Sequence, residues 1–493
     1  MTLRVYNTLK REKEPFETVQ PGKVGLYLCG PTVYKPSHLG HMVGPVIFDT
    51  VKRYLTYVGY QVAFVVNITD VDDKLIVEAA KQKTTVKELA ERVTADYVRN
   101  LERLKVTGIT HMPRATEYIG PIIRLIEGLI AKGFAYPSDG DVYFDVTRDE
   151  DYGKLCNRDP EQLEAGARIE VSDRKRNPGD FALWKGAKPG EPSWDSPWGA
   201  GRPGWHIECS AMSMQLLGET LDIHGGGLDL QFPHHENELA QSESYTGKPF
   251  ALYWMHNGLM KTDNAKMSKS KGNEIVVTSL LERHAAETLR FFLLATHYRR
   301  PIDYSEDRLQ ETLRSLENFY RFFERYKRIA SEDFFNLEAP TKRGPFDTSE
   351  THTEFLVEVG RHRAAFLEHM DDDFNTGGAI GVLFELLTTL NRYADARRLE
   401  ENKNDAEGLA AFRRGVVVLK EMSQILGIFH EPPAAPKGGD VELVSGLMQL
   451  LIDLRAEARK SKNFAMADQI RQRLAQLKVT LEDRPGETGW RKE

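Results

Sequence analysis

The chain has 493 residues, which is too long for a single hydrophobic core and predicts three or four domains. Hydrophobic residues at 41% and charged residues at 28% are typical of a soluble globular protein, and the net charge of −7 gives no general signal for nucleic-acid binding. The charged start, the lack of a long apolar run and the count of only 3 cysteines argue against secretion and membrane insertion, so we expect a cytoplasmic protein with no membrane partner.

The first hundred residues predict alternating strands and helices. Lys23–Cys29 and Gln61–Asn67 are apolar, β-rich runs, and Val46–Val58 between them carries apolar residues at helical spacing. A strand, a helix and a second strand in this order indicate a parallel sheet. A long helix is expected to start at Thr85, where Glu88 completes a capping box.

The pattern changes to short strands at Phe134. Strands are predicted at Phe134–Tyr136 and Val142–Val146 around a turn at Ser138–Asp141, followed by a loop-rich stretch from Lys175 to Pro203. The α/β pattern resumes near Gly204. Residues 134–203 therefore read as an insertion into an α/β domain.

After Thr278 the chain is predicted to be almost entirely helical. The breaks are Asn336–Ser349 and Pro432–Gly439, and the second of these has the composition of a linker. The segment from Val441 to the end is then expected to form a small separate module.

Two short motifs suggest nucleotide chemistry. Pro31–His41 lies between the first strand and the first helix, a position that binds phosphates in parallel sheets, and His38, Gly40 and His41 offer hydrogen bonds and close approach. The lysine-rich string Lys266–Asn273 can gather positive charge around a departing pyrophosphate. Each motif alone is unspecific, because a lysine run is often a solvated surface, but both in this order around an interrupted α/β domain are hard to assign to chance.

A metal site is a weaker indication from spacing alone. His234 and Glu238 are four residues apart in a stretch that begins with Pro233 and favours a helix, so both side chains would leave one helical face. Cys29 and Cys209 offer thiolates, but no CxxC spacing is present, and isolated cysteines are usually buried as small apolar groups.

The two motifs resemble the signatures of class I aminoacyl-tRNA synthetases, with Leu39 in place of the usual isoleucine. Longer strings are similar to those of the cysteinyl-tRNA synthetases, namely 67–74 (NITDVDDK), 204–212 (GWHIECSAM), 222–229 (DIHGGGLD), 233–238 (PHHENE) and 370–375 (MDDDFN). One departure is Met42–Pro45, where that family more often carries Ala-Arg.

The resemblance implies an α/β Rossmann-type catalytic domain with a small inserted α+β domain, an α-helical bundle and a small C-terminal anticodon-binding domain. The expected boundaries are 1–133 and 204–260 for the two catalytic halves, 134–203 for the insertion, 261–308 for the lysine loop and stem-contact region, 309–430 for the bundle and 441–493 for the anticodon module. The implied reaction is ATP- and Mg²⁺-dependent activation of L-cysteine and its transfer to the 3′ end of tRNA(Cys).

By the same resemblance, one Zn²⁺ ion is held by Cys29, Cys209, His234 and Glu238. Thr69 and Trp205 would line the amino-acid pocket. The implied ATP contacts are Gly40, Gly226, Asp229 and Lys269, and the groups expected to stabilise pyrophosphate are His38, His41, Lys266 and Lys269. His235 and Glu236 are expected to point away from the metal face, and Cys156 is expected to be a partly buried thiol.

Zinc suits a cysteine-selecting site. A pocket separates substrates that differ by one small group by only about 1–3 kcal/mol, whereas zinc binds a thiolate and leaves a serine hydroxyl neutral. This agrees with an insertion too short for a large proofreading domain. Because two thiolates and an imidazole already hold the metal, we hypothesise that Glu238 is the exchangeable ligand.

The carboxyl-terminal module carries a local basic patch of six residues, Arg455, Arg459, Lys460, Lys462, Arg471 and Arg473. A charged helix face is an alternative interpretation. Trp490 offers a ring on which an unpaired base can stack. The resemblance implies that Arg459, Asp468 and Asp483 read the anticodon.

Two other functions stay open at this point. A cysteine ligase of mycothiol biosynthesis uses similar zinc and ATP motifs, but it lacks a full anticodon-binding end. A non-catalytic zinc-dependent RNA-binding protein would not need His38, His41, Lys266 and Lys269. No dimerisation signal is clear, so a monomer is expected.

Overall fold

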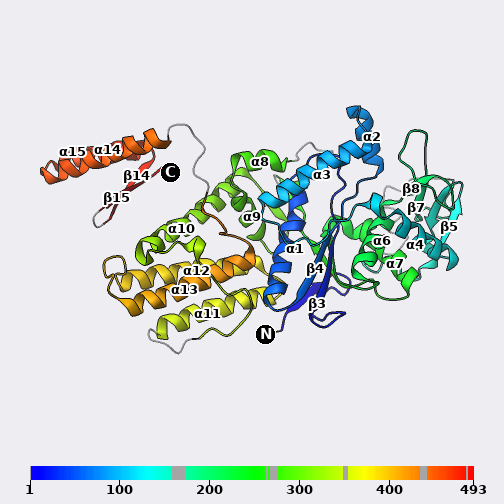
Figure 1. Ribbon diagram of the computed structural model, residues 1–493, viewed down its shortest axis with the longest axis horizontal. Coiled ribbons are helices and arrows are strands. Elements are labelled where there is room, and N and C mark those ends of the chain that lie inside the picture. The colour runs from blue at the N-terminus through cyan, green and yellow to red at the C-terminus, as the bar shows by residue number, and fades with distance from the viewer. Residues whose placement is uncertain are drawn as a thin grey trace. The chain divides into compact units, whose positions relative to one another are not determined.

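The structure is a computed structural model that describes residues 2–157, 173–262, 265–266, 275–347, 353–433, 441–484 and 487–492. The chain divides into two compact units, Met1–Pro432 and Pro433–Glu493 (Figure 1). Each unit is described by itself. The finer domain boundaries given above stay predictions.

A parallel four-stranded sheet lies at the centre of the first unit. Its strands are β3 (Lys23–Leu28), β4 (Gln61–Val66), β9 (Leu221–Gly227) and β10 (Ala251–Asn257), in the order β10-β9-β3-β4. All neighbouring pairs are parallel, and helix α1 (Gly40–Tyr57) connects β3 to β4 (Figure 1). The predicted strand, helix and strand are therefore confirmed.

Helix α1 begins at Gly40 and not at Val46, so the predicted start was wrong. The early turns carry Met42 and Val43, which are buried in the core, and the helix continues through Pro45. Proline lacks an amide hydrogen and disfavours helix interiors, which is why the pattern suggested a later start. Burial of the apolar side chains on both sides of it outweighs that local cost.

The helices that follow β4 are α2 (Asp73–Gln82), α3 (Val86–Arg103) and α4 (Ile119–Ala131). The capping box at α3 is confirmed, because the Glu88 amide donates to Thr85 Oγ1 and the Thr85 amide to Glu88 Oε2, both at 3.1 Å. Helix α2 was not predicted. It begins after Asp72, whose side chain accepts a hydrogen bond from the Lys74 amide.

The inserted region forms an antiparallel sheet of its own. Its strands are β5 (Ala135–Ser138), β6 (Asp141–Phe144), β7 (Phe181–Gly186) and β8 (Gly201–Pro203), paired in that order. The two predicted strands and the turn between them are confirmed. A separate apolar core that includes Ile126, Phe144 and Trp184 joins this sheet to α4.

The α/β pattern then resumes with α6 (Trp205–Leu217) before β9 and α7 (Glu236–Thr246) before β10. A wider π-type turn at Gln231–His235 leads into α7. Smaller strands flank the main sheet: a hairpin of β1 (Arg4–Asn7) and β2 (Glu12–Pro15), and a sheet of β11 (Met260–Thr262), β12 (Ala265–Lys266) and β13 (Ile302–Tyr304). These strands were not predicted, since two to four residues give little periodicity.

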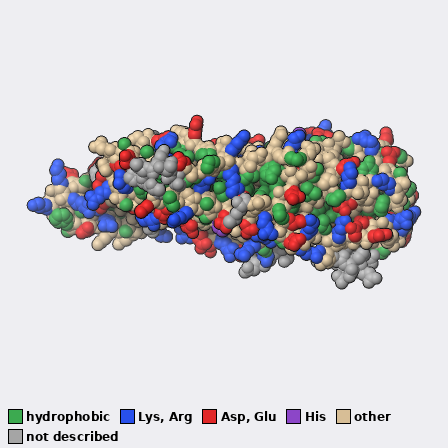
Figure 2. Space-filling model, turned by 90° about the horizontal axis from the view of Figure 1, so that it is seen from below, with side chains coloured by type: hydrophobic (Ala, Val, Ile, Leu, Met, Phe, Trp, Pro, Cys, Tyr) green, Lys and Arg blue, Asp and Glu red, His purple; other side chains and the backbone are tan. Residues whose placement is uncertain are grey.

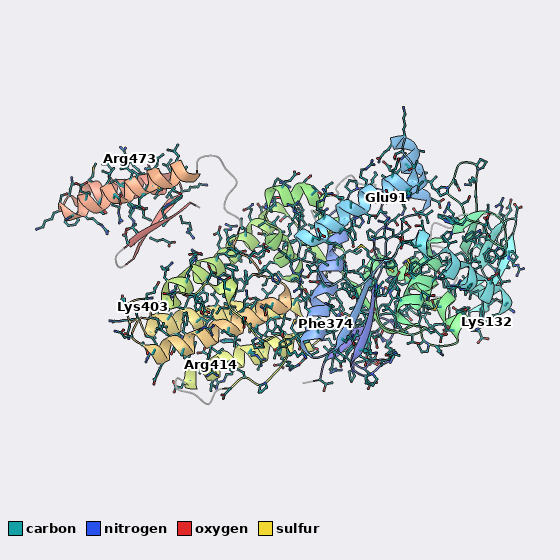
Figure 3. All side chains as sticks on the ribbon, viewed as in Figure 1. Glu91, Lys132, Phe374, Lys403, Arg414 and Arg473 are labelled. Carbon is teal, nitrogen blue, oxygen red and sulfur yellow. The ribbon has the colours of Figure 1, made fainter. Side chains whose placement is uncertain are left out.

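The rest of the first unit is helical, as predicted. Its helices are α8 (Val277–Arg283), α9 (Ala286–Leu294), α10 (Glu306–Ala330), α11 (Thr353–Asp371), α12 (Thr376–Ala396) and α13 (Ala406–Leu426). Phe374, labelled in Figure 3, is buried against the ring of Tyr54 on α1 and joins the bundle to the α/β core. Next to it, buried Asp373 accepts bonds from the Tyr6 amide and the Tyr298 hydroxyl.

The second unit contains α14 (Val441–Lys460), α15 (Phe464–Gln476) and a hairpin of β14 (Val479–Arg484) and β15 (Glu487–Lys492). Its small core includes Ile452, Leu474 and Leu481. Over the described residues of both units, no helix combines the length and apolarity needed to cross a membrane. Figure 2 shows acidic and basic side chains interspersed over one face, in keeping with the modest net charge.

A buried arginine ties the bundle to the α/β core. Arg290 on α9 is 1% exposed, and it donates to Asp49 Oδ2 at 2.7 Å and to the carbonyls of Leu104 and Leu426, each at 3.0 Å. Although burial raises the pKa of Asp49, Arg290 and Arg53 outweigh it, so the carboxyl pKa lies below its usual value. One guanidinium therefore joins the middle of α1 to the carboxyl ends of α3 and α13.

We predict that Arg290→Met lowers the free energy of unfolding of the Met1–Pro432 unit by about 3–5 kcal/mol, because it leaves two carbonyls and a buried carboxylate short of partners. Urea denaturation followed by circular dichroism measures the change. The control is Lys248→Met, which breaks an exposed ion pair with Glu219 and should cost no more than about 1 kcal/mol. Equal losses in the two variants would contradict the assignment.

Candidate metal and nucleotide site

The carboxyl edge of the parallel sheet gathers the predicted site residues. Cys29 follows β3, Thr69 lies just after β4, and Gly226 is near the end of β9. The Cys29 amide donates to the Gly225 carbonyl at 3.0 Å, which continues the pairing of β3 with β9. Open α/β sheets bind ligands at this edge, because strand ends and helix starts leave polar groups there.

Four side chains from three regions of the chain form one cluster. Ligand atoms of Cys29, Cys209, His234 and Glu238 all lie within 4.8 Å of one another. The two sulfurs are 3.9 Å apart, Cys29 Sγ is 3.4 Å from Glu238 Oε1, and His234 Nε2 is 2.9 Å from the same oxygen. A tetrahedral zinc ion with its usual bond lengths separates two sulfurs by about 3.8 Å and sulfur from oxygen by about 3.5 Å, so the geometry fits a metal.

Charge is distributed over the cluster in a way that suits a cation. Burial raises the pKa of Glu238, but His224 and His234 outweigh it and hold that pKa well below its usual value. Burial also opposes the charged forms of Cys209 and His234, yet bonds from Cys29 lower the pKa of Cys209 to about 6, and Glu238 raises that of His234 to about 10. A metal ion would therefore displace protons from buried donors that already attract positive charge.

Further imidazoles and an indole surround the ligands. His224 Nε2 lies 2.8 Å from Glu238 Oε2, the carboxylate oxygen turned away from the sulfurs. His206 Nδ1 is 3.0 Å from His234 Nδ1, and the ring of Trp205 stacks on His234 at a centroid distance of 4.2 Å. Such partners orient metal ligands. Neither His206 nor His224 was predicted as a site residue, although each lies inside a string that carried the resemblance.

The prediction that His235 points away from the cluster was wrong. A second group of ligand atoms within 4.8 Å consists of Cys29, His224, His235 and Glu238. The π-type turn at Gln231–His235 replaces the regular α-helical spacing on which the prediction relied. His235 Nδ1 lies 2.8 Å from His256 Nε2, so its ring also belongs to a buried histidine pair.

The predictions for Glu236 and Cys156 are confirmed. Glu236 faces the inserted region and not the metal cluster, and its two oxygens accept backbone hydrogen bonds from residues 153–156. Cys156 is half-buried, and it belongs to neither group of candidate ligands.

The chain just after the lysine-rich string is bonded to the histidine motif through its backbone. The Leu39 amide donates to the Ile275 carbonyl, and the Val277 amide donates to the Ser37 carbonyl, both at 2.9 Å. The segment that follows the lysine-rich string is thus fixed beside the histidine motif. Lys266 lies in β12, and its side chain is not among those described; Lys269 falls outside the described residues.

The histidine motif itself is compact. The rings of His38 and His41 stack with their centroids 3.7 Å apart, and both residues are half-buried. A side chain at Gly40 would place its Cβ 2.9 Å from the His38 ring, so only glycine leaves that space open. Both imidazoles consequently face one small region at the start of α1.

Two predicted ATP contacts, Gly226 and Asp229, lie at the end of β9 and just after it. Gly226 must be glycine, because a Cβ there would lie 2.5 Å from His235 Cε1. Asp229 lies in the exposed short turn that follows β9. This places both residues at the same sheet edge as the histidine motif.

Thr69 is held by a chain of hydrogen bonds. Its hydroxyl donates to Glu208 Oε2 at 3.2 Å and accepts from the Asn67 side chain at 3.4 Å, while Asn67 accepts from the Gly30 amide at 2.8 Å. Thr69 is 1% exposed and Glu208 is 0% exposed. This chain joins the residues beside Cys29 to the residue before Cys209. Glu208 was not predicted as part of the site.

A cavity of about 1010 Å³ opens between the inserted sheet and the cluster. Its wall includes Trp205 and His206 from α6, Asn237 from α7, and Trp198 and Lys185 from the insertion. Lys185 donates to Asp73 Oδ2 at 2.8 Å, so the charges on this wall are largely paired. The cavity therefore lies between the inserted region and the starts of α6 and α7.

Two of the predicted anticodon residues, Arg459 and Asp483, lie close together. Asp483 on β14 accepts two bonds from Arg455 at 2.5 and 2.7 Å and lies 3.5 Å from Arg459 Nη2. Asp468 is exposed on α15 and Trp490 is 36% exposed on β15, opposite Leu481. Arg455 is 3% exposed, so its inclusion in the surface basic patch was wrong: it neutralises Asp483 instead.

The parallel sheet with the histidine motif at its carboxyl edge, together with the family models below, defines a class I aminoacyl-tRNA synthetase. A family model for the tRNA synthetases class I (C) catalytic domain matches residues 15–314, one for the DALR domain matches 365–430, and one for the cysteinyl-tRNA ligase anticodon binding domain matches 447–491. The chain belongs to the cysteine–tRNA ligase family.

Individual relatives agree. The chain is 46% identical over 498 residues to the cysteine–tRNA ligase of Geobacter sulfurreducens and 44% identical over 492 residues to that of Brevibacillus brevis, with 100% of each chain covered. A Mycobacterium tuberculosis methionyl-tRNA synthetase in complex with methionyl-adenylate has a similar fold, with a TM-score of 0.61 at 15% identity over 82% of this chain and 90% of that one.

We predict that Cys209→Ala weakens zinc binding by at least about 100-fold, since each of four ligands carries roughly a quarter of a binding free energy on the order of 10–16 kcal/mol. His235→Asn should weaken it by less than about ten-fold, as expected for a residue outside the coordination shell. Equilibrium competition with a chromophoric chelator measures both. A larger loss for His235→Asn would instead assign the metal to the second group of ligands.

Proposed function

We propose that the chain activates L-cysteine with Mg²⁺-ATP and transfers it to the 3′ end of tRNA(Cys), and that zinc held by Cys29, Cys209, His234 and Glu238 selects the substrate thiolate. The observation that carries the proposal is the position of this four-ligand cluster. It lies at the carboxyl edge of the sheet that also bears the histidine motif.

The donor set favours zinc. Two sulfurs, one imidazole nitrogen and one carboxylate oxygen suit a borderline ion without geometric preference, whereas Mg²⁺ prefers oxygen alone. When bound, zinc supplies a Lewis-acid centre that coordinates a thiolate in preference to a neutral hydroxyl. Trp205, stacked on His234, and Thr69, fixed by Glu208, would bound the pocket around the rest of the amino acid.

The first step forms cysteinyl-adenylate. A carboxylate oxygen of cysteine attacks the α-phosphorus of ATP, the bond to the bridging oxygen breaks, and pyrophosphate leaves. His38 and His41 would donate hydrogen bonds to the departing charge, and Lys266 and Lys269 would add ammonium groups. Gly226 and Asp229 would hold the adenosine at the end of β9.

The second step transfers the acyl group. A terminal ribose hydroxyl of the tRNA attacks the carbonyl carbon of the adenylate, and AMP leaves with the electron pair of the broken bond. Resemblance to class I synthetases favours the 2′ hydroxyl.

The second unit would read the anticodon. Arg455 already neutralises Asp483, so the more exposed Arg459 is the cation of this group that is best placed to meet a base or phosphate. Trp490, on the same hairpin as Asp483, offers a stacking face. Asp468 on α15 would accept a hydrogen bond from a base amino group.

The related amino-sugar ligase remains the second candidate for the acceptor. The match of residues 447–491 to an anticodon-binding domain favours tRNA. Activated cysteine offered purified tRNA(Cys) or the amino sugar should pass to the tRNA alone. Transfer to the sugar would overturn this part of the proposal.

We predict that the zinc-loaded chain prefers L-cysteine over L-serine by more than about 200-fold in kcat/KM for ATP–pyrophosphate exchange, because fit alone gives no more than roughly that ratio. In the Co²⁺-substituted protein, L-cysteine should add sulfur-to-metal charge-transfer absorption and L-serine should not.

The matched control is Cys156→Ser, which removes the third cysteine and should leave both readouts unchanged. An unaltered cobalt spectrum on addition of L-cysteine would contradict direct thiolate binding.

We predict that Arg459→Ala raises the KM for tRNA(Cys) by about ten-fold, within the range of 1–3 kcal/mol for a lost base or phosphate contact. Cysteine-dependent ATP–pyrophosphate exchange should stay at the wild-type rate, since that step does not use the anticodon. Aminoacylation kinetics at two salt concentrations make the measurement, with the exposed Lys248→Ala as control. Equal loss of exchange and charging would contradict a role confined to tRNA binding.

A further inference from the structure

Glu236 lies between two proposed metal ligands on the same turn, yet its side chain serves another part of the molecule. Its Oε1 accepts hydrogen bonds from the amides of Gly153 at 3.1 Å and Leu155 at 3.2 Å. Its Oε2 accepts from the Cys156 amide at 2.7 Å. Glu236 is 0% exposed, so these three amides replace the water that a carboxylate would otherwise require.

The same stretch of the inserted region is bonded to the helix at three more points. The Tyr152 hydroxyl donates to Asn237 Oδ1 at 2.6 Å, and Lys154 Nζ donates to Glu243 Oε2 at 2.7 Å. Gln231, in the turn before α7, donates to the Leu155 carbonyl at 2.8 Å. Residues 152–156 therefore wrap the beginning of α7, and we refer to this segment with its bonds to α7 as the insertion clamp.

The start of α7 and the turn before it, which are held in this way, carry half of the proposed metal ligands. His234 precedes Glu236 by two residues and Glu238 follows it by two, and both side chains face the opposite way, toward Cys29 and Cys209. A rotation of this turn would move both ligand atoms together. The wall of the cavity contains Tyr152 of the clamp and Asn237 of α7, so the clamp also borders the cavity.

We propose that Glu236 is a positioning residue through which the inserted region fixes the metal-bearing turn. The rate at which the site releases its metal then depends on the insertion clamp. This rests on the proposed metal site and adds a coupling between that site and the insertion. Glu236 does not touch the metal or the substrate. It acts by keeping His234 and Glu238 in register with the two cysteines.

The test measures the rate at which the zinc-loaded full chain releases metal to an excess of chromophoric chelator in stopped flow. Glu236→Gln keeps the side-chain size but turns an NH₂ group toward backbone amides that need an acceptor, and release should be about ten-fold faster, as for other partners of metal ligands.

Gly153→Ala tests the coupling from the side of the insertion. Gly153 has a φ of 100°, which a residue with a side chain adopts only under strain, and it lies in the clamp without belonging to α7. Release should be about three-fold faster. This variant keeps the proposal testable if Glu236→Gln does not fold.

The matched control is Gly140→Ala. Gly140 also has a positive φ, of 81°, and lies in the insertion, but its Cβ would meet nothing within 4 Å, so the release rate should match the wild type. Wild-type release from both clamp variants, or equal acceleration by the control, would overturn the role of Glu236. A wild-type chain that binds no zinc would overturn the proposed metal site itself, and the chelator titration reports that before any variant is compared.

Discussion

A carboxylate without access to water needs a partner for each oxygen, and Glu238 meets this constraint with two imidazoles. One oxygen faces His234 and the sulfurs, and the other faces His224. Because His224 lies on β9 and His234 in the turn before α7, the pairing fixes that turn against the sheet. Cys29 follows β3, the strand next to β9. The pairing of Glu238 with His224 therefore also sets the position of the turn relative to the Cys29 sulfur.

This constraint bears on the hypothesis that Glu238 is the exchangeable ligand. Its second oxygen is already held by His224, so the carboxylate would keep one strong partner even if its contact with the metal lengthened. A substrate sulfur would then compete with a single oxygen, without creating an unpaired buried charge. The arrangement therefore makes exchange at Glu238 less costly than exchange at Cys209, whose 1% exposure leaves its thiolate with no alternative solvent partner.

The sequence predicted elements where one local signal was sufficient. The capping box at Thr85 and the apolar run of β3 needed no tertiary information. Helix α1 was misjudged at Pro45, because burial of Met42 and Val43 depends on neighbours distant in sequence. His206 and His224 could not be predicted from spacing in the sequence, because their partners His234 and Glu238 come close only in the folded chain. Arg455 looked like a surface cation for the same reason: Asp483 comes from a separate strand.

The inserted region is bonded to the turn and helix that carry two of the candidate metal ligands. Its strands contribute one wall of the cavity, and residues 152–156, which follow β6, bond the start of α7. Discrimination by a coordination bond requires that ligand atoms from distant segments stay within tenths of an ångström of a common geometry. The bonds from residues 153–156 to Glu236 and Gln231 would serve that requirement if the proposed metal site is occupied as we propose.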